Sequence, residues 1–494
     1  MKVSGLTSLN ASMRKKREAA VVALLLFFYV LLQSSTLSND PWERMGAWRQ
    51  SDTYSIALNF SQLRLNIFYP QLNYDGPSDN YVQLELQIMP FMSAMIMRLL
   101  KTATPLIPRA ISLSFYLGSA VFVYLILKRF TSYLPSLFGL LVYLLLPITL
   151  LYARAIMPES CALFFLCGSI YFLLRWHLGT KNSIWLSAVF LSVAIMEKTP
   201  VIFAGILVLA VFFWKQGIKC LRSPVFYGYG LIALLLPAAY FLYSSHIARF
   251  CFVDRITLKL VFSSRILSLF TQKGFDFFRK NLPLLFTWPV LALSFFAFLF
   301  LFNKERRFLL VWLLAFMLEN ATIVASVRFR YYLIFLAPIL SVLCGIAAQE
   351  LLSWKKRSFA SALLLTVLFL SRSGLRQWSD GTKISENIAW TGRLIESATR
   401  PSDIIAAGVL DPSYINAGYR KGYRANIKYY DYIPQEPKRE IKYFIEHGVN
   451  YFVVAGGYIY GDDGSYYKYI RDTYPLYAEN AYCKIYKLSE DQNA

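Results

Sequence analysis

The sequence predicts a mainly α-helical, polytopic membrane protein with a small α/β domain at its C-terminus. Three observations support this fold class. Of the 494 residues, 56% are hydrophobic and only 16% are charged. The apolar residues fall in blocks of roughly 16 to 22, each long enough to cross about 30 Å of hydrocarbon as a helix. The last part of the chain, 375–494, contains no such block and is rich in Asp, Gly, Pro and Tyr.

The apolar blocks predict about eleven transmembrane helices. A basic run, Met13 to Arg17, precedes the first block, which favours an uncleaved signal anchor with a cytoplasmic N-terminus. Lys and Arg in the alternate short loops then place the C-terminus outside. We expect spans near residues 19–36, 109–127, 134–152, 158–174, 183–197, 200–214, 225–243, 284–302, 307–325, 331–350 and 358–372.

The formal net charge of +22 is explained mostly by these topology-setting loops, so it does not indicate a nucleic-acid partner. The loop charges agree with the positive-inside rule only if the apolar block 86–101 lies in the membrane interface and does not cross the membrane. Whether this block crosses the membrane stays open. The outward segment 244–283 is basic and amphipathic. It suits either an interfacial helix among lipid headgroups or a cation cluster for the phosphate of a lipid-linked substrate.

We divide the chain into a transmembrane domain, 1–374, and an extracytoplasmic α/β domain, 375–494. Residues 37–104 form the first external loop of the transmembrane domain, together with its interfacial helices. Within the C-terminal domain, the residue pattern predicts strands at Asp403 to Val409, Tyr451 to Ala455 and Cys483 to Leu488, and a helix from Pro437 to His447.

Several ionisable residues collect at the predicted outer face, where charges at the ends of spans usually line a cavity or contact a partner. Asp52 and Glu159 are the candidate catalytic acids. Asp52 could instead be a helix N-cap or a solvated acid, and Glu159 could be an acid of the first helical turn, which the helix dipole favours. Glu197 and Lys198 could simply pair with each other. The candidate residues for binding phosphate and sugar are Arg49, Gln50, Glu85, Arg154, Lys198, Arg255, Lys259, Arg328, Arg330 and Tyr331.

The residue types argue against a Cys/His zinc site, because no CxxC pair occurs and only three His are present. The carboxylates of Asp52 and Glu159 could hold a divalent cation, which prefers oxygen ligands, or could act as a base without a metal. The sequence fits both possibilities equally well. Aromatic residues of the first loop could stack on a sugar or form an interfacial belt: Trp42, Trp48, Tyr54, Tyr69, Tyr74 and Tyr81.

Three short motifs resemble bacterial membrane glycosyltransferases of the GT-C fold. They are Trp48-Arg49-Gln50-Ser51-Asp52-Thr53 followed by Ile67-Phe68-Tyr69-Pro70, then Arg154…Met157-Pro158-Glu159, then Arg330-Tyr331-Tyr332…Pro338. More narrowly, the motifs are similar to the family-39-like group that is related to protein mannosyltransferases and includes the aminoarabinose lipid A transferase. The resemblance covers roughly residues 20 to 350.

The resemblance implies a GT-C-like fold and a transferase in the bacterial inner membrane. Such an enzyme moves a hexose or pentose from a polyprenyl-phosphate carrier to a lipid, glycan or protein acceptor on the outer face. The acid of the first loop, matched by Asp52, would be the base or would anchor a metal, and Glu159 would match a second acid. Leu84 to Pro90 lacks the usual cationic, proline-rich run. The phosphate-binding cation would therefore come from Lys198, Arg328, Arg330 or the 249–280 cluster.

Two other functions stay open: a transporter of polyprenyl-linked glycans, and a non-catalytic relative in surface-polysaccharide assembly. Transporters usually contain internal repeats and ionisable residues near mid-membrane. This sequence has neither a convincing duplication between its halves nor a mid-membrane cluster of charges.

Overall fold

The computed structural model describes residues 2–76, 79–251, 266–354, 357–428 and 432–488. The chain divides into two compact units. The helical unit comprises Met1–Ser38, Arg109–Tyr243 and Phe252–Asp380. The α/β unit comprises Asn39–Pro108, Ser244–Cys251 and Gly381–Ala494. The predicted domains, 1–374 and 375–494, divide the chain differently, because residues 39–108 pack with the C-terminal residues.

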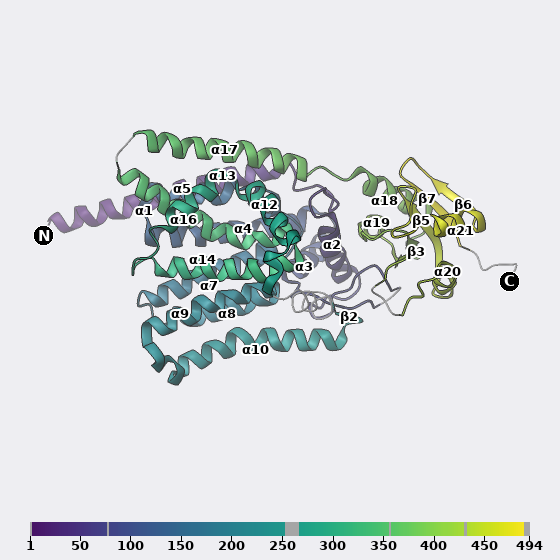
Figure 1. Cartoon of the computed structure of the whole chain (residues 1–494), viewed down its shortest axis with the longest axis horizontal. Helices are drawn as coiled ribbons and strands as arrows, with labels where there is room; N and C mark the ends of the chain where they lie inside the picture. The colour runs from purple at the N-terminus through teal and green to yellow at the C-terminus, as the bar shows by residue number, and fades with distance from the viewer. Residues whose placement is uncertain (1, 77–78, 252–265, 355–356, 429–431, 489–494) are drawn as a thin grey trace. The chain divides into compact units, whose positions relative to one another are not determined.

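Long helices make up the helical unit, and they run alongside one another (Figure 1). Helix α7 packs along α8, α5 and α13 pack against α16, and α9 packs against α14. The helices are α1 (Lys2–Ser34), α4 (Leu106–Phe130), α5 (Tyr133–Leu145), α6 (Pro147–Tyr152), α7 (Glu159–His177), α8 (Ser183–Glu197), α9 (Ala204–Gln216), α10 (Pro224–Ile247), α12 (Gln272–Phe286), α13 (Trp288–Phe298), α14 (Arg307–Glu319), α15 (Ala325–Val327), α16 (Ala337–Ser353) and α17 (Arg357–Gly381).

Among the described residues, eight helices are long and apolar enough to cross a membrane, and a ninth results if the bent pair α12 and α13 is one span. These nine lie at predicted spans. The other two predicted spans, 134–152 and 183–197, fall on shorter apolar helices of 13 and 15 residues. The first is shorter than expected because Leu146 leaves the helical conformation (φ −54°, ψ 136°) before Pro147, where a new helix begins. The chain is a multi-pass membrane protein.

The α/β unit contains a five-stranded mixed sheet in the order β4-β3-β5-β7-β6. Strand β3 (Ile404–Ala407) runs parallel to β4 (Lys421–Arg424) and β5 (Val449–Ala455), and β7 (Cys483–Lys487) runs antiparallel to β5 and β6 (Leu476–Glu479). The predicted strands and helix of this region are confirmed. The two strands of this sheet that we did not predict, β4 and β6, are short, lie at its edges and carry no apolar run.

Four helices accompany the sheet: α18 (Glu386–Ala398), α19 (Ser413–Ala417), α20 (Pro437–Glu446) and α21 (Ser465–Thr473). The same unit contains the predicted first external loop, which forms α2 (Ala47–Gln62), β1 (Val82–Gln83) and α3 (Ile88–Leu100). Strand β1 pairs with β2 (Phe250–Cys251) in parallel. Helix α3 has 13 residues, about 20 Å of helix, which is too short to span the hydrocarbon core.

The first loop also continues the edge of the sheet. The Gly422 amide of β4 donates to the Asn73 carbonyl (2.8 Å), and the Asp75 amide donates to the Gly422 carbonyl (2.6 Å). Gly422 is required there, because a Cβ atom would lie 2.0 Å from the carbonyl oxygen of Ile405. Backbone pairing therefore ties Tyr74 and its neighbours to β4.

Candidate active-site residues

Asp52 is a buried carboxyl group inside α2, with 5% of its surface exposed. The Tyr74 hydroxyl donates to Oδ2 over 3.0 Å, and the side-chain amide of Asn416 donates to Oδ1 over 3.1 Å. Asp52 is thus neither an N-cap nor a solvated acid. We did not single out Asn416 from the sequence, because it lies 364 residues away and carries no local signal. Tyr74 was named only among the aromatic residues that could stack on a sugar or form an interfacial belt.

Burial is the main influence on the ionisation of Asp52. It raises the pKa of Asp52 to about 7 by disfavouring the charged form, and the negative charge of Asp411 adds to this effect. The Arg49 guanidinium, the Tyr74 hydrogen bond and the Arg424 guanidinium act in the opposite direction. A carboxyl group that titrates near neutral pH matches the pKa that is best for general-base catalysis.

Asp75, the residue after Tyr74, forms a buried ion pair with Arg424 of β4. The Arg424 guanidinium donates to Asp75 Oδ2 from Nη2 (2.6 Å) and from Nε (3.1 Å), and both side chains are almost fully buried. The guanidinium also lies over the Tyr74 ring, 4.6 Å from its centroid. Asp75 has a φ of 64°, in the left-handed region, and its contacts with β4 hold it there. Arg424 was also missing from the residues predicted from sequence.

Three predicted substrate-binding residues make contacts within the α/β unit. Arg49 forms an ion pair with Glu85, which is itself nearly buried. The Gln50 amide donates to the Met45 carbonyl over 3.2 Å. Of the aromatic residues in the first loop, Trp42, Tyr54 and Tyr74 are buried in this unit.

In the helical unit, Glu159 and Lys198 form an ion pair of 2.8 Å between buried side chains. Glu159 is the first residue of α7, directly after Pro158, so it also occupies the first-turn position that favours an acid. Lys198 follows the last residue of α8, where the backbone becomes extended before Thr199 and Pro200. The ends of two neighbouring helices thus bring these predicted residues together.

Two tyrosine rings lie beside the Lys198 ammonium group. Its Nζ atom lies 4.4 Å from the centroid of Tyr332 and 5.2 Å from that of Tyr331. The Tyr331 ring stacks on Phe329 and meets the edge of Tyr152. This arrangement holds a cation among apolar surroundings.

The remaining predicted cations differ in their exposure. Arg154 is completely buried, Arg330 is half-buried and Arg328 is exposed. The Arg328 backbone has a φ of 54°, and its side chain donates to the Ala325 carbonyl over 3.3 Å. Arg255 and Lys259 lie outside the described residues.

In the part of the chain that the structure describes, no group of three or more His, Cys, Asp or Glu residues could hold a metal ion.

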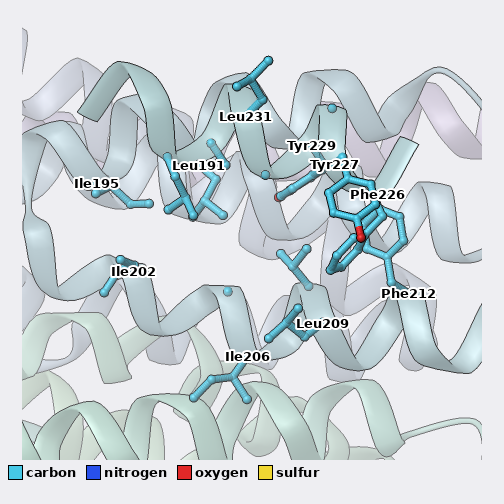
Figure 2. Close-up of a pocket in the computed structure, with 16 residues that line it drawn as sticks. Leu191, Ile195, Ile202, Ile206, Leu209, Phe212, Phe226, Tyr227, Tyr229 and Leu231 are labelled. Atoms are coloured by element: carbon cyan, nitrogen blue, oxygen red, sulfur yellow. The ribbon is translucent and has the colours of Figure 1, made fainter. Parts of the chain in front are cut away.

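The helical unit also contains an apolar cavity of about 760 Å³ between α8, α9 and α10. Figure 2 shows Leu191 and Ile195 of α8 facing the same space as Leu209 of α9 and Tyr229 of α10. Several lining residues, Leu231 among them, are largely exposed, so the cavity lies at the outer surface of the unit. The described residues that line it include no charged side chain.

Comparison with known proteins gives a consistent result. The model of the dolichyl-phosphate-mannose-protein mannosyltransferase family matches residues 88–243. Among curated proteins, none matches the sequence of this chain. The structure of ArnT from Cupriavidus metallidurans bound to undecaprenyl phosphate is similar with a TM-score of 0.69 and 10% sequence identity, over 97% of this chain and 98% of ArnT.

Two other glycosyltransferases have similar structures. The Archaeoglobus fulgidus oligosaccharyltransferase matches with a TM-score of 0.63 and 12% identity, over 89% of this chain and 69% of that protein. The mycobacterial arabinofuranosyltransferase AftD matches with a TM-score of 0.54 and 14% identity, over 97% of this chain and 40% of AftD. The architecture that the three sequence motifs predicted is thereby confirmed: this chain has the GT-C fold, the fold of these membrane glycosyltransferases.

Proposed function

We propose that this protein is a glycosyltransferase that moves a sugar from a polyprenyl-phosphate carrier to an acceptor on the outer face of the bacterial inner membrane. The observation that carries the proposal is the buried carboxyl group of Asp52, held by Tyr74 and Asn416. The fold supports the reaction class. A polyprenyl-phosphate donor is supported by the undecaprenyl phosphate bound to ArnT and by the description of the matching family model.

In the proposed reaction, Asp52 is the general base. The oxygen of an acceptor hydroxyl forms a bond to the anomeric carbon of the sugar, while the bond from that carbon to the phosphate oxygen breaks. Polyprenyl phosphate leaves with the bonding electrons, and the hydroxyl proton passes to Asp52. Each carboxylate oxygen of Asp52 receives one hydrogen bond, so lone pairs remain for the acceptor proton. Direct displacement inverts the anomeric configuration.

The phosphate of the carrier requires cations, and we assign this role to Lys198, Arg154, Arg328 and Arg330. Glu159 compensates the Lys198 charge until the phosphate arrives, and the tyrosine rings beside Lys198 restrict its position. Compensation by Glu159 avoids an isolated buried charge, which would be very unfavourable. The cavity between α8, α9 and α10 has the apolar lining that an isoprenoid chain requires.

The test uses membranes that contain the protein, a small panel of radiolabelled polyprenyl-phosphate sugars and cell-envelope extract as the source of acceptor. Wild type is compared with Asp52→Asn and with Glu440→Gln. Glu440 is a matched control, because it is a buried carboxyl of the same unit whose pKa burial also raises to about 7. It hydrogen-bonds to Tyr466 and to the Asn426 amide, within the sheet region.

We expect wild type and Glu440→Gln to transfer label, and Asp52→Asn to transfer at least about 100-fold less, the usual range for loss of a general base. Full transfer by Asp52→Asn would disprove the assignment of the base. Absence of transfer by wild type with every donor, together with tight binding of polyprenyl phosphate, would indicate a carrier-lipid binding protein without this chemistry.

A further inference from the structure

We propose that Asn416 is a positioning residue for Asp52, so that the C-terminal part of the chain completes the catalytic centre and is not merely an appended binding domain. This inference rests on the proposed function. It assigns Asn416 to the orientation of the carboxylate and assigns it no contact with the sugar donor.

Each carboxylate oxygen of Asp52 accepts a hydrogen bond from a different side chain. The Asn416 amide nitrogen donates to Asp52 Oδ1 (3.1 Å) and to the Ser51 hydroxyl (3.2 Å), while Tyr74 donates to the other carboxylate oxygen. Asn416 has only 4% of its surface exposed. With one donor on each oxygen, the carboxylate cannot rotate about its terminal bond without losing a buried hydrogen bond, which is costly.

Further contacts hold Asn416 itself in position. The Ser51 hydroxyl donates to the Ser413 hydroxyl (3.1 Å), and the Ser413 hydroxyl donates to Asp411 Oδ1 (2.6 Å). The Ser413 backbone amide donates to the same oxygen (2.9 Å). Four buried residues, Trp42, Ala47, Ile388 and Ala417, pack together and join α2 to α18 and α19. Hydrogen bonds and apolar packing therefore hold the segment that carries Asn416, as a positioning residue requires.

The residue type is informative as well. A carboxylate at position 416 would bring a second negative charge to about 3 Å from Asp52, which would strongly disfavour its ionised form. An amide of nearly the same shape donates hydrogen to Asp52 and adds no charge. Leucine has the same branched shape and the same number of side-chain heavy atoms but no donor, so Asn416→Leu removes the hydrogen bonds to Asp52 and Ser51.

Removal of this donor has two expected effects on the reaction. The carboxylate loses its orientation, so kcat decreases while KM for the lipid donor changes little. The ionised form of Asp52 also loses a stabilising contact, so the acidic limb of the pH–rate profile moves to higher pH. The other groups that act on this ionisation are Arg49, Tyr74, Arg424 and Asp411, and all four remain in the variant.

The experiment uses the purified full-length chain and compares wild type, Asn416→Leu and Asn416→Asp. We expect kcat to fall roughly 10- to 100-fold in Asn416→Leu, with KM within about twofold of wild type. The acidic limb should shift upward by about one pH unit. Asn416→Asp should be less active than Asn416→Leu at pH 7. The control is Asn59→Leu, which removes a buried amide of α2 that donates to the Gln71 carbonyl and to the Asn73 side-chain oxygen.

Asn59→Leu should lower the melting temperature without moving the pH–rate profile. If Asn416→Leu lowers the melting temperature and leaves both kcat and the pH profile unchanged, Asn416 is only structural and the inference is wrong. An unshifted acidic limb together with a reduced kcat would contradict it too, because the contact with Asp52 would then be absent.

A measurement without substrate separates this inference from the proposed function. The melting temperatures of wild type, Asn416→Leu, Asp52→Asn and the double variant are compared at pH 5.5 and pH 8.5. We expect Asn416→Leu to cost more stability at pH 8.5, where Asp52 is ionised, and this pH dependence to vanish in the Asp52→Asn background. Lack of coupling would overturn the inference. Coupling in a chain with no transferase activity would overturn the proposed function while leaving the Asn416–Asp52 contact established.

Discussion

Asp75 and Arg424 are 349 residues apart in the sequence and form a buried ion pair in the structure, with Arg424 Nη2 2.6 Å from Asp75 Oδ2. Asp75 directly follows Tyr74, which donates to Asp52, and Arg424 ends strand β4. The pair therefore connects the support of the proposed base to the C-terminal sheet.

Breaking this pair should destabilise the α/β unit strongly. Arg424→Met leaves the Asp75 carboxylate buried without its partner, and we expect a loss of about 3–5 kcal/mol in the free energy of unfolding. Thermal unfolding of the purified protein measures this loss. Arg439→Met is the matched control, because Arg439 pairs with Glu436 on the surface, with 79% of its side chain exposed. The control should change stability little. Equal melting temperatures for the two variants would contradict the prediction.

The raised pKa of Asp52 predicts how activity depends on pH. A general base acts only in its deprotonated form, so kcat/KM should decrease as the pH falls through about 7. At pH 6 only about a tenth of the enzyme would carry an ionised Asp52. Initial rates between pH 5 and 9 test this expectation. A flat profile down to pH 5 would mean that Asp52 is not the base or that its pKa is not raised.

The buried pair of Glu159 and Lys198 should show strong energetic coupling. Glu159→Gln removes the carboxylate that pairs with Lys198, and Lys198→Met removes the ammonium group that pairs with Glu159, so each single variant should lose about 3–5 kcal/mol of stability. The double variant should lose clearly less than the sum. A double-mutant cycle of thermal unfolding measures the coupling. Additive losses would show that the two side chains do not depend on each other.

The double variant, Glu159→Gln with Lys198→Met, also tests the proposed role of Lys198 in binding the carrier phosphate. If Lys198 holds the carrier phosphate, the double variant should bind polyprenyl phosphate at least about tenfold more weakly than wild type, even where its stability has recovered. Wild-type affinity in a stable double variant would transfer that role to the other proposed cations.

The apolar cavity of Figure 2 gives a prediction about the lipid chain. Gly230 of α10 lines the cavity, and beyond its own stretch of helix no heavy atom of the described residues lies within 4 Å of a Cβ atom placed there. Gly230→Phe should fill part of the space and weaken polyprenyl-phosphate binding about tenfold, without loss of folding. Leu364→Phe, at a position of α17 with 61% of its surface exposed, is the control and should bind normally. Unchanged binding by Gly230→Phe would show that the cavity does not hold the isoprenoid chain.

The sequence by itself determined the class of protein and most of its elements. Apolar blocks of membrane length, and the strand-like segments at 403–409, 451–455 and 483–488, are local patterns, and a helix or strand depends mainly on local periodicity. The three short motifs, taken together in their order and spacing, also indicated the fold, which the comparisons confirmed. The break between α5 and α6 at Leu146 was harder to predict from the sequence, because the apolar run continues through Pro147.

Only the tertiary structure decided the surroundings of the candidate residues. Asp52 is held by Tyr74 and by Asn416, which are 22 and 364 residues away, and Lys198 pairs with Glu159 at the end of another helix. Neither partnership leaves a trace in local composition, because burial and hydrogen-bond partners follow from how distant segments pack. The same packing raises the pKa of Asp52 to about 7, since desolvation exists only once α2 is covered.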